Sequence, residues 1–199
     1  MSIRKIAFWA VGTAATVVVG GTAWMLGPAL MPPQDVAVGV EIEDTVPVEM
    51  ELRYASGDAT SLAANMGERG MVLLFVRSAE WCPVCQRQLI DTEDIREAVT
   101  GSGFALAGLS YDEPAILAEF AANKGIGYLL FSDKGSRMID ALGLRDPQYE
   151  PGSKAHGVPR ATILVLAPDG KVKKRHVSAD YRSRPSNEDV LAMIDEARD

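Results

Sequence analysis

Two cysteines, Cys82 and Cys85, are the residues of this 199-residue chain best suited to chemistry, and they stand three positions apart. Cysteine attacks as a thiolate, whereas a free thiol with a pKa of about 8.5 is mostly protonated near neutral pH. A helix N-terminus favours the thiolate, and a partner one turn further on can close a small disulfide ring. Since the chain holds no third cysteine for a structural disulfide, we predict that this pair exchanges thiols and disulfides.

The two sulfurs are expected to have different roles. Cys82 is predicted to be the exposed, attacking thiol, and Cys85 the more buried thiol that resolves the mixed disulfide. Pro83 would occupy the first turn of the helix, where its missing N–H costs little. Trp81 would cover the site with an apolar plane, and Glu80 and His156 are the accessory candidates for carrying protons.

Two metal-based alternatives compete with redox chemistry. A zinc site takes four ligands, yet no second cysteine pair exists, and His156 and His176 lie far along the chain without close pairing. Two thiolates can also hold Cu(I), which would make the chain a copper carrier or an assembly module rather than an enzyme. We expect no metal and no cofactor other than the disulfide itself.

The elements around the cysteines suit this chemistry. Residues 71–76 form a continuous apolar run, typical of a central strand buried on both faces, and a helix is predicted over residues 83–99. Strands alternate with helices along the rest of the chain, which predicts a central mixed β-sheet flanked by helices. The other predicted strands are residues 46–54, 104–111, 128–131, 161–167 and 171–178. The other predicted helices are residues 114–124, 136–142 and 187–198, and residues 61–66 are predicted to be a short helix or a loop.

The N-terminal region is predicted to be a membrane anchor. Residues 6–31 carry no charge and are long enough to span a bilayer as a helix, and Arg4 and Lys5 place the N-terminus in the cytoplasm. The small residues at 21–23 also fit a cleaved signal peptide, which would release the domain. Both interpretations export the domain, to the periplasm or another extracytoplasmic space. The predicted parts are an anchor or signal segment (1–31), a linker (32–45) and one globular domain (46–199).

The composition of the chain argues against one class of binding partner. The formal net charge of -7 makes nucleic-acid binding an unfavourable function, because an acidic surface repels phosphates. Hydrophobic residues make up 47% of the chain, which is enough for a packed core.

The segment Trp81-Cys82-Pro83-Val84-Cys85, after an apolar strand and before a helix, resembles the thioredoxin superfamily. The resemblance covers roughly residues 46–199 and implies a thioredoxin-like fold. It also implies a cis peptide bond at Val158–Pro159, where the backbone of Val158 would pair with an extended substrate beside Cys82.

Within the superfamily the chain looks most like the redoxin or peroxiredoxin-like branch, the AhpC/TSA type, with two departures. Peroxiredoxins carry a proline and a threonine that help activate peroxide, and here Phe75 and Ala79 stand at those positions. Thioredoxins often carry a buried aspartate six residues before the first cysteine, and here that residue is Val76. Arg77 next to it would lower the thiolate pKa if it pointed to the site, while a solvent-facing or salt-bridged arginine is the alternative.

These observations predict an exported, membrane-tethered thiol–disulfide oxidoreductase that acts on protein disulfides and receives electrons from a membrane thiol donor. A peroxiredoxin-like thiol peroxidase with an antioxidant function is the second prediction. The direction of electron flow stays open at this point.

Overall fold

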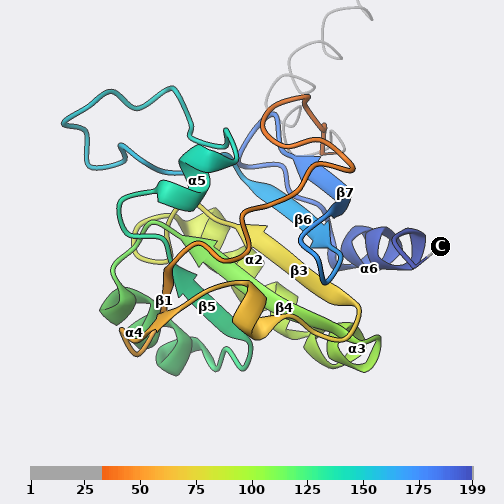
Figure 1. The fold of residues 1–199 in the computed structure, drawn as a ribbon. Coiled ribbons are helices and arrows are strands. Elements are labelled where there is room, and N and C mark those ends of the chain that lie inside the picture. Colours follow the sequence, from red (N-terminus) through yellow and green to blue (C-terminus); the bar gives the residue numbers. More distant parts are fainter. Residues whose placement is uncertain (1–32, 199) are drawn as a thin grey trace, which may run out of the picture. The chain divides into compact units, whose positions relative to one another are not determined.

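The computed structural model describes residues 33–198, which form one compact unit (Figure 1). The predicted anchor at residues 6–31 lies outside the described residues. Among the helices of residues 33–198, none is both long and apolar enough to cross a membrane.

A seven-stranded mixed sheet forms the centre of the unit, with the strand order β2-β1-β5-β4-β3-β6-β7 (Figure 1). The three inner strands β3, β4 and β5 are parallel, whereas β1 and β6 run antiparallel to their neighbours. The predicted mixed sheet with flanking helices is confirmed. The strands are β1 (Leu52–Tyr54), β2 (Ala59–Thr60), β3 (Gly70–Phe75), β4 (Phe104–Ser110), β5 (Leu129–Ser132), β6 (Thr162–Leu166) and β7 (Val172–Val177).

Helices cover both faces of the sheet. They are the 3-10 helix η1 (Ala63–Asn65) and the α-helices α2 (Pro83–Glu93), α3 (Arg96–Gly101), α4 (Pro114–Lys124), α5 (Arg137–Ala141) and α6 (Asn187–Glu196). Helix α4 matches its predicted bounds, because Pro114 suits a first turn and Gly125 ends the helix in the left-handed conformation at φ 69°.

Strand β3 divides the core into two apolar layers. Val72 and Leu74 face the layer built with α2, α3, α4 and α6, whereas Met71, Leu73 and Phe75 face the layer built with α5 and the segment before β3. Successive strand residues point to opposite faces, so a strand buried on both sides reads as a continuous apolar run. The predicted central strand is therefore confirmed, and it leads directly to the cysteines.

Two predicted elements differ from the structure. The strand expected over residues 46–54 begins only at Leu52, because Pro47 offers no N–H and the amide of Val48 bonds to the carbonyl of Val46 in a turn. The helix expected over residues 83–99 breaks between α2 and α3. The amides of Asp94 and Ile95 bond only three residues back there, which tightens and ends the first helix.

The segment predicted as a linker, residues 32–45, makes regular contacts with the sheet from residue 34 onward. The Val36 amide donates to the carbonyl of Val177, and the Asp35 carboxylate accepts the Val177 amide at 2.7 Å. The side chain of Arg175 pairs with both Asp35 and Glu41. This segment covers the outer edge at β7, which an exposed strand otherwise presents for aggregation.

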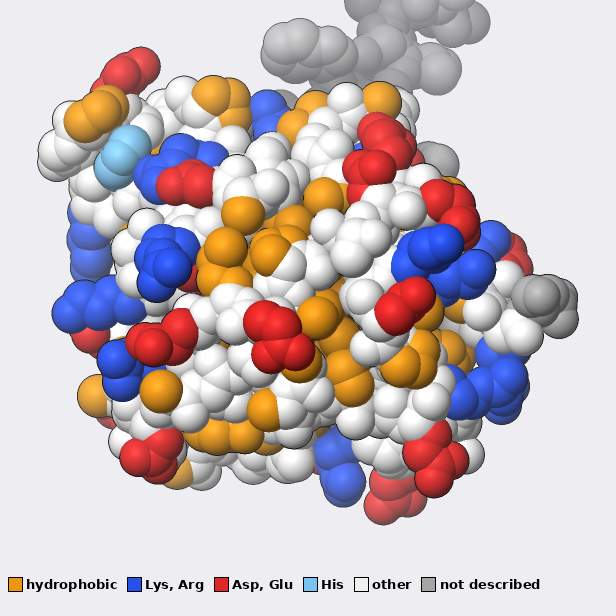
Figure 2. Space-filling model, viewed as in Figure 1, with side chains coloured by type: hydrophobic (Ala, Val, Ile, Leu, Met, Phe, Trp, Pro, Cys, Tyr) orange, Lys and Arg blue, Asp and Glu red, His pale blue; other side chains and the backbone are white. Residues whose placement is uncertain are grey.

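The visible surface carries charges of both signs. On the face shown in Figure 2, acidic and basic side chains are interspersed and apolar side chains lie between them. This face offers no continuous basic surface of the kind that binds a phosphate backbone.

Candidate active site

Cys82 is the residue that begins helix α2. It takes the N-cap position with extended dihedrals (φ -105°, ψ 96°), and Pro83 fills the first turn as predicted. The Cys82 Sγ accepts the backbone N–H of Cys85 at 3.3 Å, and the two sulfurs form a disulfide across Cα atoms 5.2 Å apart. The Cys82 sulfur is thus placed against an otherwise unpaired helix amide, which favours a thiolate there.

Both sulfurs lie within the apolar layer under α2. Cys82 is 2% exposed and Cys85 0%, so the predicted exposure of Cys82 is wrong for this disulfide form. The reason is that the N-cap falls beside Val76 and Ala79 of the same core cluster, against which Trp81 also packs.

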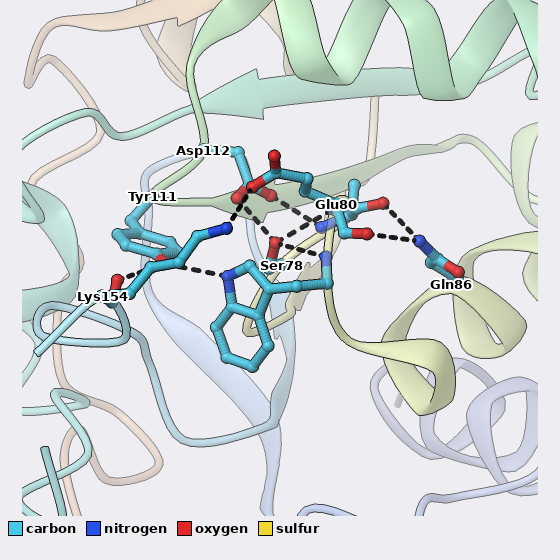
Figure 3. A network of polar contacts seen from close by, with 8 residues as sticks. Ser78, Glu80, Gln86, Tyr111, Asp112 and Lys154 are labelled. Carbon is cyan, nitrogen blue, oxygen red and sulfur yellow. Dashed lines mark hydrogen bonds and ion pairs between the residues drawn. The ribbon is translucent and has the colours of Figure 1, made fainter.

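A buried carboxylate, Asp112, holds the loop between β3 and Cys82 (Figure 3). It accepts the Ser78 hydroxyl at 2.8 Å, the Ala79 amide at 2.7 Å and the Ser110 hydroxyl at 2.8 Å. Burial raises the pKa of Asp112, and the hydrogen bond from the Ala79 amide is the largest opposing effect. Sequence reasoning missed this residue, although a polar Ser-Tyr-Asp run at the end of a buried strand was a usable signal.

Further polar contacts join the loop that contains Lys154 to the site (Figure 3). The Trp81 indole donates to the Tyr111 hydroxyl at 3.0 Å, and that hydroxyl donates to the Lys154 carbonyl at 3.0 Å. Glu80 is exposed and pairs with the Lys154 ammonium at 3.4 Å. Its carboxylate is thereby engaged at the rim of the site rather than bonded to a sulfur.

His156 is engaged away from the sulfurs. Its Nδ1 lies 3.0 Å from the Tyr149 carbonyl and its Nε2 lies 3.1 Å from Arg145. A carbonyl accepts only, so Nδ1 carries the proton and Nε2 accepts from the guanidinium. The structure therefore does not bring this predicted proton carrier to Cys82 or Cys85.

Arg77 is buried, at 3% exposed, and neither solvent-facing nor salt-bridged within residues 33–198. Its guanidinium carbon lies 4.0 Å from the Tyr181 ring centroid, 5.0 Å from that of Tyr149 and 5.3 Å from that of Trp81. One guanidinium nitrogen also donates to the Tyr149 hydroxyl. The cation is thus held by three aromatic faces at the rim of the dithiol site.

The Val158–Pro159 peptide bond is trans, so the cis bond implied by the resemblance is wrong. The backbone of Val158 is also occupied, because its carbonyl accepts the Asp146 amide at 2.9 Å and its amide donates to Ala155 at 3.2 Å. Pro159 forms an isolated bridge with Arg145. These local pairs use the groups that a substrate strand would otherwise bond.

Arg184 reaches the second cysteine from the loop before α6. Its Nη2 lies 3.4 Å from the Cys85 Sγ, and its Nη1 donates to the Gln88 side chain at 2.9 Å. Burial, and secondarily the charge of Arg77, lowers the pKa of Arg184 to about 10. Sequence reasoning did not identify this contact, since nothing local connects residues 99 positions apart.

No group of three or more His, Cys, Asp and Glu side chains gathers within residues 33–198. A zinc site takes four such ligands, and this part of the chain does not assemble them.

A central parallel strand that leads into a dithiol at a helix N-terminus, within a mixed sheet covered on both faces, defines a thioredoxin-like redox protein. The family model described as AhpC/TSA family matches residues 42–175, and the chain belongs to that family. This confirms the predicted redoxin branch. Members of the family use cysteine redox chemistry without a cofactor.

Curated relatives are similar at low identity. Peroxiredoxin Bcp of Escherichia coli strain K12 is 25% identical over 140 residues, which is 70% of this chain and 86% of that protein. Thiol-disulfide oxidoreductase ResA of Halalkalibacterium halodurans is 24% identical over 141 residues, covering 70% of this chain and 65% of that protein.

Solved structures share the fold. Peroxidoxin BcpB from Mycobacterium tuberculosis superposes with a TM-score of 0.66 at 21% identity, over 80% of this chain and 97% of that chain. Peroxiredoxin Q of Xanthomonas campestris gives a TM-score of 0.65 at 19% identity, over 80% and 98%.

Proposed function

We propose that the protein is an exported, membrane-tethered thiol–disulfide oxidoreductase that uses Cys82 and Cys85 on protein disulfides. The observation that carries this proposal is the Cys82–Cys85 disulfide at the start of α2, with the Cys85 amide on the Cys82 sulfur. A dithiol couple in this position can take up and release two electrons without any other group.

In the reductive direction, the Cys82 thiolate attacks one sulfur of the substrate disulfide. The substrate's S–S bond breaks, a Cys82–substrate disulfide forms, and the other substrate sulfur leaves as a thiolate that takes a proton from water. The Cys85 thiolate then attacks the Cys82 sulfur and displaces the second substrate thiolate, which is also protonated. The substrate gains two electrons and two protons, and the protein becomes the Cys82–Cys85 disulfide.

Turnover requires a dithiol donor that returns two electrons to this disulfide. Outside the cytoplasm such electrons must arrive across the membrane, so a membrane thiol donor is the proposed partner. The uncharged residues 6–31 behind Arg4 and Lys5 support the tether, with the N-terminus in the cytoplasm and the domain in the periplasm or another extracytoplasmic space. Cleavage near residues 21–23 would give a secreted form instead.

The trapping experiment tests the proposal. The full chain carrying Cys85→Ser should accumulate a mixed disulfide between Cys82 and its natural partner, visible as a reducible higher-mass band that mass spectrometry identifies. Cys82→Ser is the matched control and should trap nothing and lose all activity. Full turnover by Cys85→Ser without a trapped species would contradict the proposal.

A thiol peroxidase is the second candidate, and the relatives named peroxiredoxin favour it. In that reaction Cys82 attacks peroxide and becomes a sulfenic acid, and Cys85 condenses with it, releasing water and forming the disulfide. Ala79 offers no hydroxyl beside Cys82, which disfavours fast peroxide activation. Stopped-flow oxidation of the reduced domain decides between the two: peroxide-dependent rates far above those of a free thiol would replace our first proposal.

A further inference from the structure

Arg184 is the only guanidinium of residues 33–198 that contacts a sulfur of the dithiol. We propose that Arg184 is a positioning residue that stabilises the thiolate of Cys85, both when the disulfide is reduced and when Cys85 resolves a mixed disulfide. This inference rests on the proposed dithiol chemistry and names the residue that stabilises the second sulfur of the pair, that of Cys85.

The guanidinium is fixed on three sides. Its Nε donates to the Tyr181 carbonyl at 2.5 Å and its Nη1 donates to the Gln88 side chain at 2.9 Å, which leaves Nη2 directed at Cys85. Gln88 comes from the turn of α2 that follows Cys85, so the helix that carries the sulfur also anchors the cation. A side chain held in this way loses little further entropy when it stabilises an anion.

The charge of Arg184 is not neutralised by a partner. No carboxylate of residues 33–198 lies within ion-pair distance of its guanidinium, and Asp180 acts on its charge only from beyond that distance. Arg175, in contrast, pairs with Asp35 and Glu41. A buried charge without a counterion is costly. A thiolate at Cys85 would supply the missing counterion, and a neutral disulfide does not.

Each of the two sulfurs therefore has its own hydrogen-bond donor. The Cys85 amide at the start of α2 faces Cys82, and the guanidinium faces Cys85. Once Cys85 becomes a thiolate, a Coulomb attraction between opposite charges is added to this hydrogen bond, so the contact to Cys85 strengthens on reduction. A contact that is stronger in one state shifts the equilibrium toward that state, here the reduced dithiol.

The step is reduction of the resting disulfide. A donor thiolate attacks the Cys82 sulfur, a donor–Cys82 bond forms, the Cys82–Cys85 bond breaks, and its electron pair leaves on Cys85. The departing sulfur is the one beside Arg184, and a thiolate of lower pKa leaves faster. A groove of about 460 Å³ lined by Gln88, Arg184 and Pro185 opens beside this contact.

Thiolate absorbance at 240 nm tests the inference without any substrate. In a Cys82→Ser background, titration reports the ionisation of Cys85 alone. Arg184→Gln should raise the pKa of Cys85 by about one unit or more, the usual effect of an opposite charge at this range. Arg184→Lys keeps the positive charge, so it should raise the pKa of Cys85 less than Arg184→Gln does.

Arg182→Gln is the matched control, because Arg182 lies two residues away, is solvent-exposed and pairs with Asp180. It should leave the pKa of Cys85 unchanged. With Cys82 present, Arg184→Gln should also slow reduction of the disulfide by dithiothreitol, by less than tenfold for each unit of pKa change, because only part of a change in the leaving thiol's pKa appears in the rate of exchange.

An unchanged Cys85 pKa in folded Arg184→Gln and Arg184→Lys would overturn the inference. A raised pKa of Cys85 in Arg184→Gln, together with failure of the Cys85→Ser trap, would instead contradict the proposed activity on protein disulfides and still support the assignment of Arg184. The two failures are thus distinguishable.

Discussion

The carboxylate of Asp112 accepts the backbone N–H of Ala79 at 2.7 Å, and this bond joins the end of β4 to the loop that carries Cys82. Asp112→Ala should lower the free energy of unfolding by about 2–3 kcal/mol, since the buried Ala79 amide loses its partner. Denaturant titration measures the loss.

Asp112→Asn retains the size and one acceptor oxygen and should cost less than Asp112→Ala. Asp91→Ala, which removes an exposed carboxylate 3.9 Å from Arg87, should stay within about 0.5 kcal/mol of the wild type. Equal stability of Asp112→Ala and Asp91→Ala would mean that the loop is held by other contacts.

The aromatic rings around Arg77 predict that replacing this residue lowers the stability of the domain. Arg77→Ala should destabilise the domain by about 2–3 kcal/mol, because desolvated cation–π contacts and the packing of the side-chain stem disappear together. Arg77→Lys should cost less but not nothing, since an ammonium lacks the planar face that stacks on rings. Arg87→Ala, at an exposed position, is the control, and thermal unfolding compares the three. An Arg77→Ala variant more stable than the wild type would show that burying the cation costs more free energy than its contacts with the rings contribute.

His176 predicts a dependence of stability on pH. Burial lowers the pKa of His176, and its Nε2 has no hydrogen-bond partner within residues 33–198. The unfolded chain therefore binds a proton at higher pH than the folded one, so stability should fall as pH drops below about 6.5. Denaturant titrations between pH 7.5 and 5.5 measure this slope.

His176→Gln should flatten that slope, because glutamine does not titrate. His156→Gln serves as the control and should leave the contribution of His176 in place. A slope that survives in His176→Gln at full size would assign the effect to other groups.

Gly70 begins β3 with φ +120°, and a Cβ there would lie 1.8 Å from the carbonyl oxygen of Leu166. Gly70→Ala should cost more than about 2 kcal/mol, since both the dihedral strain and the backbone clash must be relieved by moving β3 against β6. Gly101→Ala meets no atom within 4 Å and should be neutral or slightly stabilising, because alanine favours a helix end over glycine. Thermal unfolding of both variants checks the contrast, and similar melting temperatures would refute it.

Much of the fold was predictable from local signals. The apolar run before the cysteines defines β3, and Pro114 with Gly125 marks the ends of α4, because strand burial and helix termination depend on a few neighbouring residues. The cysteine spacing predicted the disulfide at the start of α2 for the same reason. The break between α2 and α3 was missed, because a tightened turn after Glu93 leaves no glycine or proline in the sequence.

The surroundings of the sulfurs were decided only by the tertiary structure. Arg77 meets Tyr149 across 72 positions, Asp112 reaches Ala79 across 33, and Arg184 reaches Cys85 across 99. Such contacts depend on how the sheet and its loops are packed, and no short pattern of residue types encodes them. By itself the sequence predicted which two sulfurs form the disulfide and at which helix end they sit. The packing decided which charges face them, because a side chain's counterion is chosen by distance in space and not by distance along the chain.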